Sequence, residues 1–313
     1  MFDVDAKFVK NPTYNLIMYM NKYCEDKITK KVESLFGNLQ THFNKLFCTV
    51  GFIHEIQKDE EFMRNYNKTG VIGIQNVEYC YYKISTIFDI AYQIADILVF
   101  PKNKEQKNRY HYLESKFIEY SNNLDHLNIE WYKNINLIRN KITHGGIKVT
   151  PFYIHENPLL GKRLCFQAYN LDLDDLTVPD YCYSNSYNNY INFSDNYFAF
   201  HTHALYCYLK DFFDFIMFEL NKNLKNDIND LTLENDFMGF GERNKKWVLS
   251  NVDTFLKITK EMIFLDKNEG LFLSNDIHKN ITDEIILTYD LFKILHDIEN
   301  CFITEEEYKK EKS

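Results

Sequence analysis

The chain has 313 residues and a formal net charge of −9, with hydrophobic residues at 45% and charged residues at 26%. This composition is ordinary for a globular protein, and the length allows one large domain or two modest ones. The acidic balance argues against broad, non-specific coating of nucleic acid, which needs a basic surface, but it leaves room for a local basic site.

The seven cysteines are scattered and form no C-x-x-C pair, as expected for thiols in a reducing cytoplasm. The first residues lack the basic region and apolar core of a signal peptide. The most apolar stretch, residues 84–100, contains Asp89, Gln93 and Asp96, so it predicts a buried helix and not a membrane span. We therefore expect a cytoplasmic protein that has no contact with a membrane.

Apolar residues at helical spacing predict several helices in the first half of the chain. The first begins at Pro12, and the second covers about residues 32–53. The polar residues 57–68 predict a loop or a solvated helix end. A long helix then covers residues 74–100 and stops before Pro101, which cannot continue it.

A charged linker at residues 102–108 leads into a helix of mixed polarity. The next helix, called the motif helix here, begins at about residue 124. It ends at Gly145 and Gly146, because glycine readily adopts the positive φ that closes many helices.

The last turns of the motif helix contain the pattern R-N-x-x-x-H, formed by Arg139, Asn140 and His144. At about 100° per residue, Asn140 and His144 share one face as an i,i+4 pair. Arg139 and His144 instead lie about 140° apart around the helix axis. A compact site therefore requires either a swing of the long Arg139 side chain or a second copy of the motif across a symmetry axis.

Residues 138–145, with the sequence Ile-Arg-Asn-Lys-Ile-Thr-His-Gly, resemble the signature of the HEPN superfamily. Members are small helical domains whose R-x4-6-H motif, often with a polar residue after the arginine, makes many of them metal-independent ribonucleases. The resemblance implies a mainly α-helical bundle over the first two thirds of the chain. It also implies a homodimer through the motif helix, in which two motifs face one cleft.

The residue types of the motif suit this chemistry. His144 can exchange protons near neutral pH, and so can deprotonate a ribose 2′-OH or protonate the leaving 5′-oxygen. Arg139, one of only five arginines in the chain, can hold the scissile phosphate, and Asn140 can orient the histidine or bind substrate. Such a reaction cleaves RNA but not DNA and leaves a 2′,3′-cyclic phosphate and a 5′-OH without metal or another cofactor.

Further charged residues are candidates for supporting roles. Lys133, Lys141 and Lys148 make the surroundings of the motif basic and are candidate substrate contacts. The long helix 74–100 carries a polar stripe that includes Asp89 and Asp96. This stripe is either a solvated edge or a source of one carboxylate that orients Arg139 or His144 by a charge-assisted bond.

After Gly146 the hydrophobic pattern alternates over residues 147–154 and 163–169, which predicts a β-hairpin. Residues 170–195 predict an irregular insertion, and an aromatic helix follows over residues 199–224. The polar residues 221–230 are the best domain boundary. We therefore expect a helical domain at 1–230, with a β and irregular insertion at 147–198, and a helical C-terminal extension at 231–313.

Other possible sites have weaker patterns. His201 and His203 lack a third metal ligand at a diagnostic spacing, so we expect both to be structural and predict no metal site. The acidic run formed by Asp172, Asp174 and Asp175 is expected to lie on an exposed strand or loop. Gly239-Phe-Gly241 lacks the third glycine of a dinucleotide-binding loop and predicts a turn.

Two alternatives to a ribonuclease remain. A non-catalytic HEPN-like module would use the same groove to bind RNA or a protein, and a plain helical interaction protein would contain the motif by coincidence. Toxins of the superfamily that pair with nucleotidyltransferase antitoxins often carry a tyrosine two residues after the histidine, where this chain has Gly146. This departure argues against that pairing, leaves a role in defence against phage or in growth arrest open, and does not identify a regulatory partner.

Overall fold

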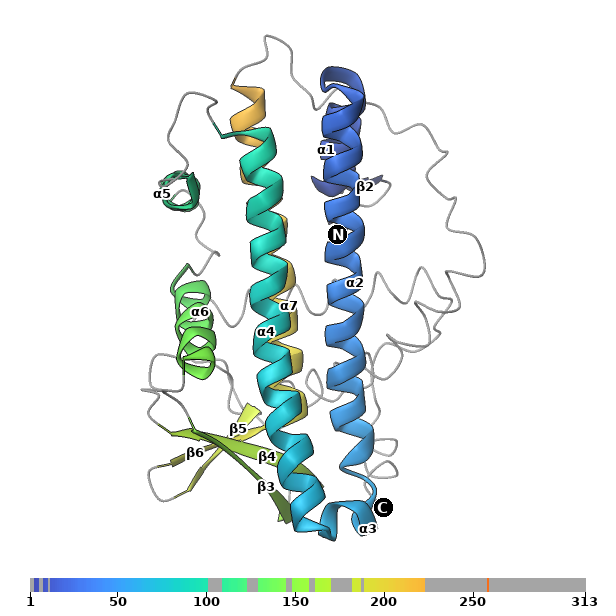
Figure 1. The fold of residues 1–313 in the computed structure, drawn as a ribbon, viewed down its shortest axis with the longest axis vertical. Coiled ribbons are helices and arrows are strands. Elements are labelled where there is room, and N and C mark those ends of the chain that lie inside the picture. Colours follow the sequence, from blue (N-terminus) through green and yellow to red (C-terminus); the bar gives the residue numbers. More distant parts are fainter. Residues whose placement is uncertain are drawn as a thin grey trace, which may run out of the picture.

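The computed structural model describes residues 3–5, 8–10, 12–100, 109–122, 129–144, 148–157, 161–169, 182–186, 189–222 and 258. Three long helices contact one another along their lengths: α2 (Asp26–Ile56), α4 (Tyr66–Leu98) and α7 (Ser194–Asn221). Figure 1 shows them side by side, with the chain running in one direction in α2 and in the opposite direction in α4 and α7. The described part of the chain is therefore mainly α-helical, as the sequence predicts.

Shorter elements surround the three long helices. Helix α1 (Pro12–Tyr23) contacts α2 and α7, and α3 (Glu60–Arg64) lies at the turn between α2 and α4. Helix α5 (Arg109–Ser121) packs on α4 and α7, whereas the motif helix α6 (Ile129–Thr143) packs on α4. In Figure 1, α6 lies beside α4 on the side away from α2.

Two antiparallel sheets complete the fold. Strands β1 (Asp3–Asp5) and β2 (Phe8–Lys10) pair near the N-terminus. The predicted hairpin forms as β3 (Lys148–Asn157) and β4 (Gly161–Tyr169), directly after the motif helix. Strands β6 (Asn189–Phe193) and β5 (Tyr183–Ser186) extend it to a four-stranded sheet in the order β3-β4-β6-β5, so the described residues 183–186 and 189–193 of the predicted irregular insertion are strands.

Side-chain caps explain why the polar segment after α2 is not a simple loop. The Asp59 carboxylate accepts a hydrogen bond from the Phe62 backbone N–H at 2.9 Å and starts α3. The Asn65 side chain accepts from the Lys68 backbone N–H at 3.3 Å and starts α4, eight residues before the predicted start at residue 74. The predicted start depended on apolar spacing, which is interrupted in the first turns of α4.

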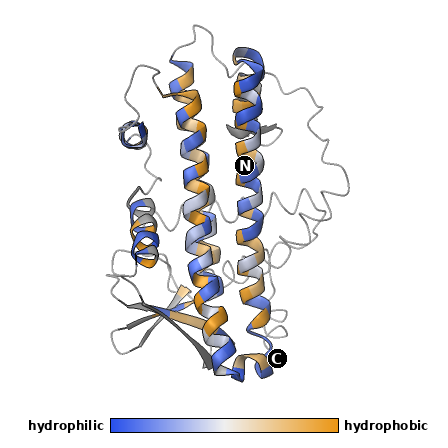
Figure 2. Cartoon of the chain, viewed as in Figure 1, coloured by the Kyte–Doolittle hydropathy of each residue, from blue (hydrophilic) through white to orange (hydrophobic). Residues whose placement is uncertain are grey.

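The core is rich in aromatic rings supplied by α4, α5 and α7. Phe117 contacts Tyr208 and Phe212 edge-on, with ring centroids 5.2 and 5.1 Å apart, and Phe88 contacts Tyr208 at 4.9 Å. Each such pair contributes about 0.5–1.5 kcal/mol beyond the burial of its area. Figure 2 shows hydrophobic and hydrophilic residues alternating around α2 and α4, which is the amphipathic pattern that gives each a buried face.

The predicted C-terminal extension at 231–313 lies outside the described residues except for Ile258, which is buried in the same core as the long helices.

The sequence also predicts that residues 84–100 form a buried helix and not a membrane span. None of the described helices is both long enough and apolar enough to span a bilayer.

Candidate functional site

Helix α6 separates its apolar and polar residues cleanly. Ile135 and Ile138 are buried against the bundle, and Ile142 packs against the same core. The opposite face exposes Lys133, Leu137, Asn140 and His144, which follow one another at helical spacing. The two buried isoleucines therefore fix the helix so that Asn140 and His144 face outward together.

Arg139 lies at the edge of this exposed face and forms a side-chain hydrogen bond with Asn140. Its Nη1 donates a hydrogen bond to the Asn140 side-chain oxygen at 2.9 Å. From the sequence, Asn140 is predicted to orient His144 or to bind substrate. The structure instead places its side-chain oxygen on the guanidinium.

Asp89 on α4 acts electrostatically on Arg139. Packing against neighbouring side chains raises the pKa of Asp89 above its ordinary value, and the positive charge of Arg139 opposes this rise. Asp96, the other predicted carboxylate, accepts a hydrogen bond from Arg109 Nε and belongs to a separate ion pair. Of these two residues, the structure thus brings only Asp89 together with the motif.

His144 follows the last residue of α6. Its backbone N–H donates to the Asn140 carbonyl at 3.0 Å, so helical hydrogen bonding continues to this residue. Its side chain is exposed. Gly145 and Gly146, the predicted helix stop, lie outside the described residues.

The candidate substrate lysines lie around the motif. Lys133 is exposed about three turns before His144, and Lys141 is partly buried next to the motif. Lys148 is the first residue of β3. Two of the three lysines therefore belong to α6, and the third begins the strand that follows α6 in the sequence.

Replacing Asp89 by asparagine tests whether this carboxylate serves function rather than stability. Because folding raises the pKa of Asp89, ionised Asp89 favours the unfolded chain, and this cost is present once the pH exceeds the folded-state pKa. Asp89→Asn is therefore expected to raise the Tm slightly at pH 7. It is also expected to weaken any activity that depends on Arg139 by a few-fold, because the guanidinium loses an orienting charge.

Thermal unfolding and an RNA cleavage assay measure the two effects. Gln93→Ala is a matched control, since Gln93 is exposed on the same helix one turn further along. A lower Tm with unchanged activity would assign Asp89 a purely structural role.

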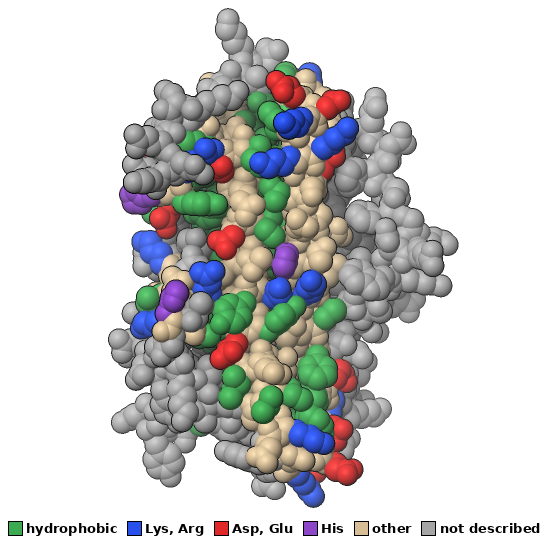
Figure 3. Space-filling view, in the orientation of Figure 1, with side chains coloured by type: hydrophobic (Ala, Val, Ile, Leu, Met, Phe, Trp, Pro, Cys, Tyr) green, Lys and Arg blue, Asp and Glu red, His purple; other side chains and the backbone are tan. Residues whose placement is uncertain are grey.

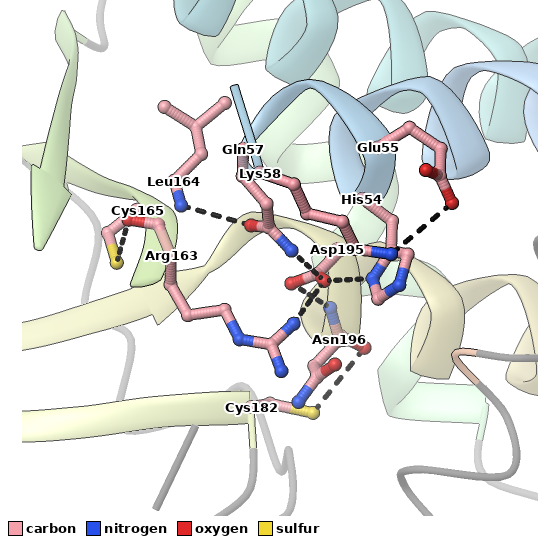
Figure 4. A network of polar contacts seen from close by, with 10 residues as sticks. All are labelled: His54, Glu55, Gln57, Lys58, Arg163, Leu164, Cys165, Cys182, Asp195 and Asn196. Atoms are coloured by element: carbon pink, nitrogen blue, oxygen red, sulfur yellow. Dashed lines mark hydrogen bonds and ion pairs between the residues drawn. The ribbon is translucent and has the colours of Figure 1, made fainter. Parts of the chain in front are cut away.

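A second polar cluster, which the sequence analysis missed, is buried where α2, β4 and α7 meet (Figure 4). The Asp195 carboxylate oxygen Oδ2 contacts Arg163 Nη1 at 2.6 Å, Gln57 Nε2 at 2.7 Å and His54 Nδ1 at 2.9 Å. Gln57 also accepts a hydrogen bond from the Leu164 backbone N–H at 3.1 Å. We call His54, Gln57, Arg163 and Asp195 the Asp195 network.

Charge compensation explains how a buried carboxylate is tolerated there. Burial alone would raise the pKa of Asp195, but the Arg163 charge and the hydrogen bonds from His54 and Gln57 outweigh it and hold that pKa far below its ordinary value. Asp195 also lies in the first turn of α7, where the helix dipole favours a negative charge. All four side chains are nearly inaccessible, so the network suits a structural role better than substrate binding.

A single signal in the sequence points toward this network. Arg163 is one of only five arginines and lies within an alternating strand, where a charged residue that is buried needs a partner. The partner itself has no local signal, because Asp195 is 32 residues away from Arg163 and 141 residues away from His54.

The two predicted structural histidines are buried in α7. Burial lowers the pKa of His201 and that of His203 to about 3, so both are neutral at physiological pH. Among the described residues, no three His, Cys, Asp or Glu side chains gather in a way that could hold a metal ion. Asp172, Asp174, Asp175 and the Gly239-Phe-Gly241 segment lie outside the described residues.

No known protein family model, curated protein or solved structure matches this chain. The assignment of function therefore depends on the residues and geometry described above. The surface site at the end of α6 is the candidate functional site, since the motif residues reach solvent there and the Asp195 network does not.

Proposed function

We propose that the chain is a metal-independent endoribonuclease of the HEPN type, with the end of α6 as its catalytic site. The observation that carries the proposal is the surface grouping of Arg139, Asn140 and Asp89, with exposed His144 at the end of the same helix. A proton-transfer group and a guanidinium are the two groups that 2′-OH attack on phosphate requires, and a swing of Arg139 or a second copy of the motif would bring them together.

Each residue has a separate part in this reaction. His144 removes the proton from the 2′-OH or delivers one to the leaving 5′-oxygen. Arg139 Nη1 donates to Asn140, and the planar guanidinium is the group proposed to contact the phosphate. Asp89 and Asn140 restrict the directions in which that guanidinium points.

The proposal includes a homodimer through α6. Proton transfer at both the attacking and the leaving oxygen is easiest with two histidines, and the described part of one chain supplies one at this site. The outward face of α6 includes Leu137, which is 50% exposed between Lys133 and Asn140. Burying that leucine against its copy would bring the two His144 side chains toward one cleft.

Incubation of the purified chain with mixed RNA in excess EDTA tests the proposal. We expect fragments with 2′,3′-cyclic phosphate and 5′-OH ends, and no cleavage of the same sequences made with 2′-deoxyribose. The oligomeric state is measured alongside by light scattering. Intact RNA with folded, dimeric protein, or 3′-OH ends, would contradict the proposal, whereas RNA binding without cleavage would favour a non-catalytic module.

A further inference from the structure

Two lysines and a histidine lie together between α2 and α4, apart from the motif helix. Lys83 Nζ on α4 lies 3.4 Å from His42 Nδ1 on α2, and the charge of Lys45, one turn after His42, acts on both. Within the described part of the chain, neither Lys45 nor Lys83 forms an ion pair with a carboxylate. We call His42, Lys45 and Lys83 the cationic cluster.

Bringing these groups together costs free energy. Burial and Lys45 lower the pKa of Lys83, and burial together with the two lysines lowers the pKa of His42. The chain has 45 acidic residues, yet none of those described compensates this cluster, while surface lysines such as Lys58 and Lys116 pair with nearby glutamates. A negatively charged ligand from outside the chain would compensate the cluster.

One exposed aromatic ring contacts the cationic cluster, and a second lies further along α2. Lys83 Nζ lies 4.8 Å from the centroid of the Tyr79 ring, which is 36% exposed. Phe52 is 48% exposed and follows Lys45 by seven residues on α2, which is two turns or about 10 Å along the same face. Figure 3 shows blue basic side chains and a purple histidine near mid-height on the face viewed in Figure 1, with green hydrophobic side chains next to them.

This combination favours single-stranded nucleic acid over other anions. Single strands expose both phosphates, which bind lysines, and unpaired bases, which stack on aromatic rings. An acidic peptide would use the lysines and leave the rings unexplained. A duplex would hide the base faces that the rings can stack on.

The cluster also lies near the candidate functional site. Lys83 and Asp89 are six residues apart on α4, or about 9 Å along its axis, on the two edges of its exposed face. Helix α2 lies along one edge and α6 along the other (Figure 1). A single strand of RNA that crosses α4 can therefore contact the cationic cluster and Arg139 together.

We infer that the cationic cluster, with Tyr79 and Phe52, is a binding site for single-stranded RNA, in which the lysines hold phosphates and the rings stack bases. The binding site stands on the α2 and α4 residues alone. Its role in delivering substrate to His144 rests on the proposed function.

Fluorescence anisotropy with a labelled 12-nucleotide RNA tests the inference, and the His144→Ala chain is used so that the RNA stays intact. Lys45→Gln together with Lys83→Gln is expected to weaken binding by at least about 10-fold, since two charge-assisted contacts are lost. The slope of log K against log salt is expected to fall by about 1.4, because two phosphate contacts disappear. Tyr79→Ala is expected to weaken binding by about 10-fold with little change in that slope.

Lys30→Gln together with Lys31→Gln is the matched control, because both lysines are exposed on α2 near its start and carry the same charge change. Folding is not expected to limit the experiment, since removing like charges from the cluster should keep or raise the Tm. Equal losses in the cluster and control variants, or no loss in either, would overturn the inference. Polyglutamate that displaces RNA at an equal concentration of charge would also overturn it, in favour of an acidic protein partner.

The two proposals can fail independently. Cluster-dependent binding without cleavage by the wild-type chain would retain this site and remove the nuclease. Cleavage that is unaffected by the cluster variants would retain the nuclease and remove this site.

Discussion

His144→Ala is expected to lower the rate of RNA cleavage by about 10²- to 10⁴-fold, the usual contribution of a general acid or base. The Tm should change little, because the side chain of His144 is exposed at the end of α6 and substitutions at such positions usually alter stability by less than about 0.5 kcal/mol. Single-turnover cleavage of a defined RNA, measured in EDTA, gives the rate without a contribution from product release.

Arg139→Lys is the companion variant. It keeps the positive charge but loses the planar guanidinium, which donates to Asn140 and which the proposed reaction uses for the phosphate, so the rate is expected to fall by about 10²-fold or more. His111→Ala serves as the matched control, because His111 on α5 is also a highly exposed histidine. A wild-type rate in His144→Ala, or an equal loss in His111→Ala, would show that α6 is not the catalytic helix.

Asp195→Asn is expected to reduce the free energy of unfolding by about 3–5 kcal/mol, the usual effect of removing one partner of a buried ion pair. The amide cannot neutralise Arg163, whose side chain is almost fully buried, and it cannot accept every hydrogen bond that the carboxylate accepts from Arg163, Gln57 and His54. Urea unfolding at pH 7 measures the difference.

The pH dependence of this difference provides a second check. The pKa of Asp195 is depressed in the folded chain, so its contribution to stability is present above the unfolded-state pKa of about 4 and declines as the pH falls below it. The gap between wild type and Asp195→Asn should therefore narrow in acid. Asp96→Asn is the control, because its ion pair with Arg109 is partly exposed and should contribute less than about 1 kcal/mol. Equal urea midpoints for the wild-type and Asp195→Asn chains would mean that the network does not stabilise the fold.

The long helices are predictable from the sequence because their signal is local. The predicted apolar face of the last described helix is buried throughout, at Leu205, Tyr208, Leu209, Phe212, Phe213, Ile216 and Leu220. Its start was wrong by five residues, since α7 begins at Ser194 and its first turn contains Asp195 and Asn196, which favour turns when judged by type alone. In the structure, Asp195 forms its tertiary contacts from within this first turn.

The short strands were missed for a similar reason. Strands β5 and β6 are rich in Asn, Ser and Tyr and do not alternate polar and apolar residues. They form because β6 pairs with β4, at Cys165 with Phe193 and Phe166 with Asn192, next to the core. Pairing between segments that are distant in the sequence gives neither segment a local hydrophobic pattern from which the strand could be predicted.

The same distinction applies to the polar groupings on the surface of the described residues. Arg139, Asn140 and His144 lie within six residues and are visible as a motif, whereas Asp89 joins them only through the packing of α6 on α4. The cationic cluster also depends on packing, since His42 and Lys83 are 41 residues apart. The sequence therefore predicts the motif, and Asp89 as one of two candidate carboxylates, but it does not predict the cationic cluster.

The Asp195 network also has a kinetic consequence. Its contacts to His54 and Gln57 close loops of 141 and 138 residues, so forming either contact in an unfolded chain carries the closure entropy of a long loop. Such contacts are expected to be absent from the folding transition state and to be completed after the helices have packed. The network would then slow unfolding far more than it speeds folding, and so set the lifetime of the native protein.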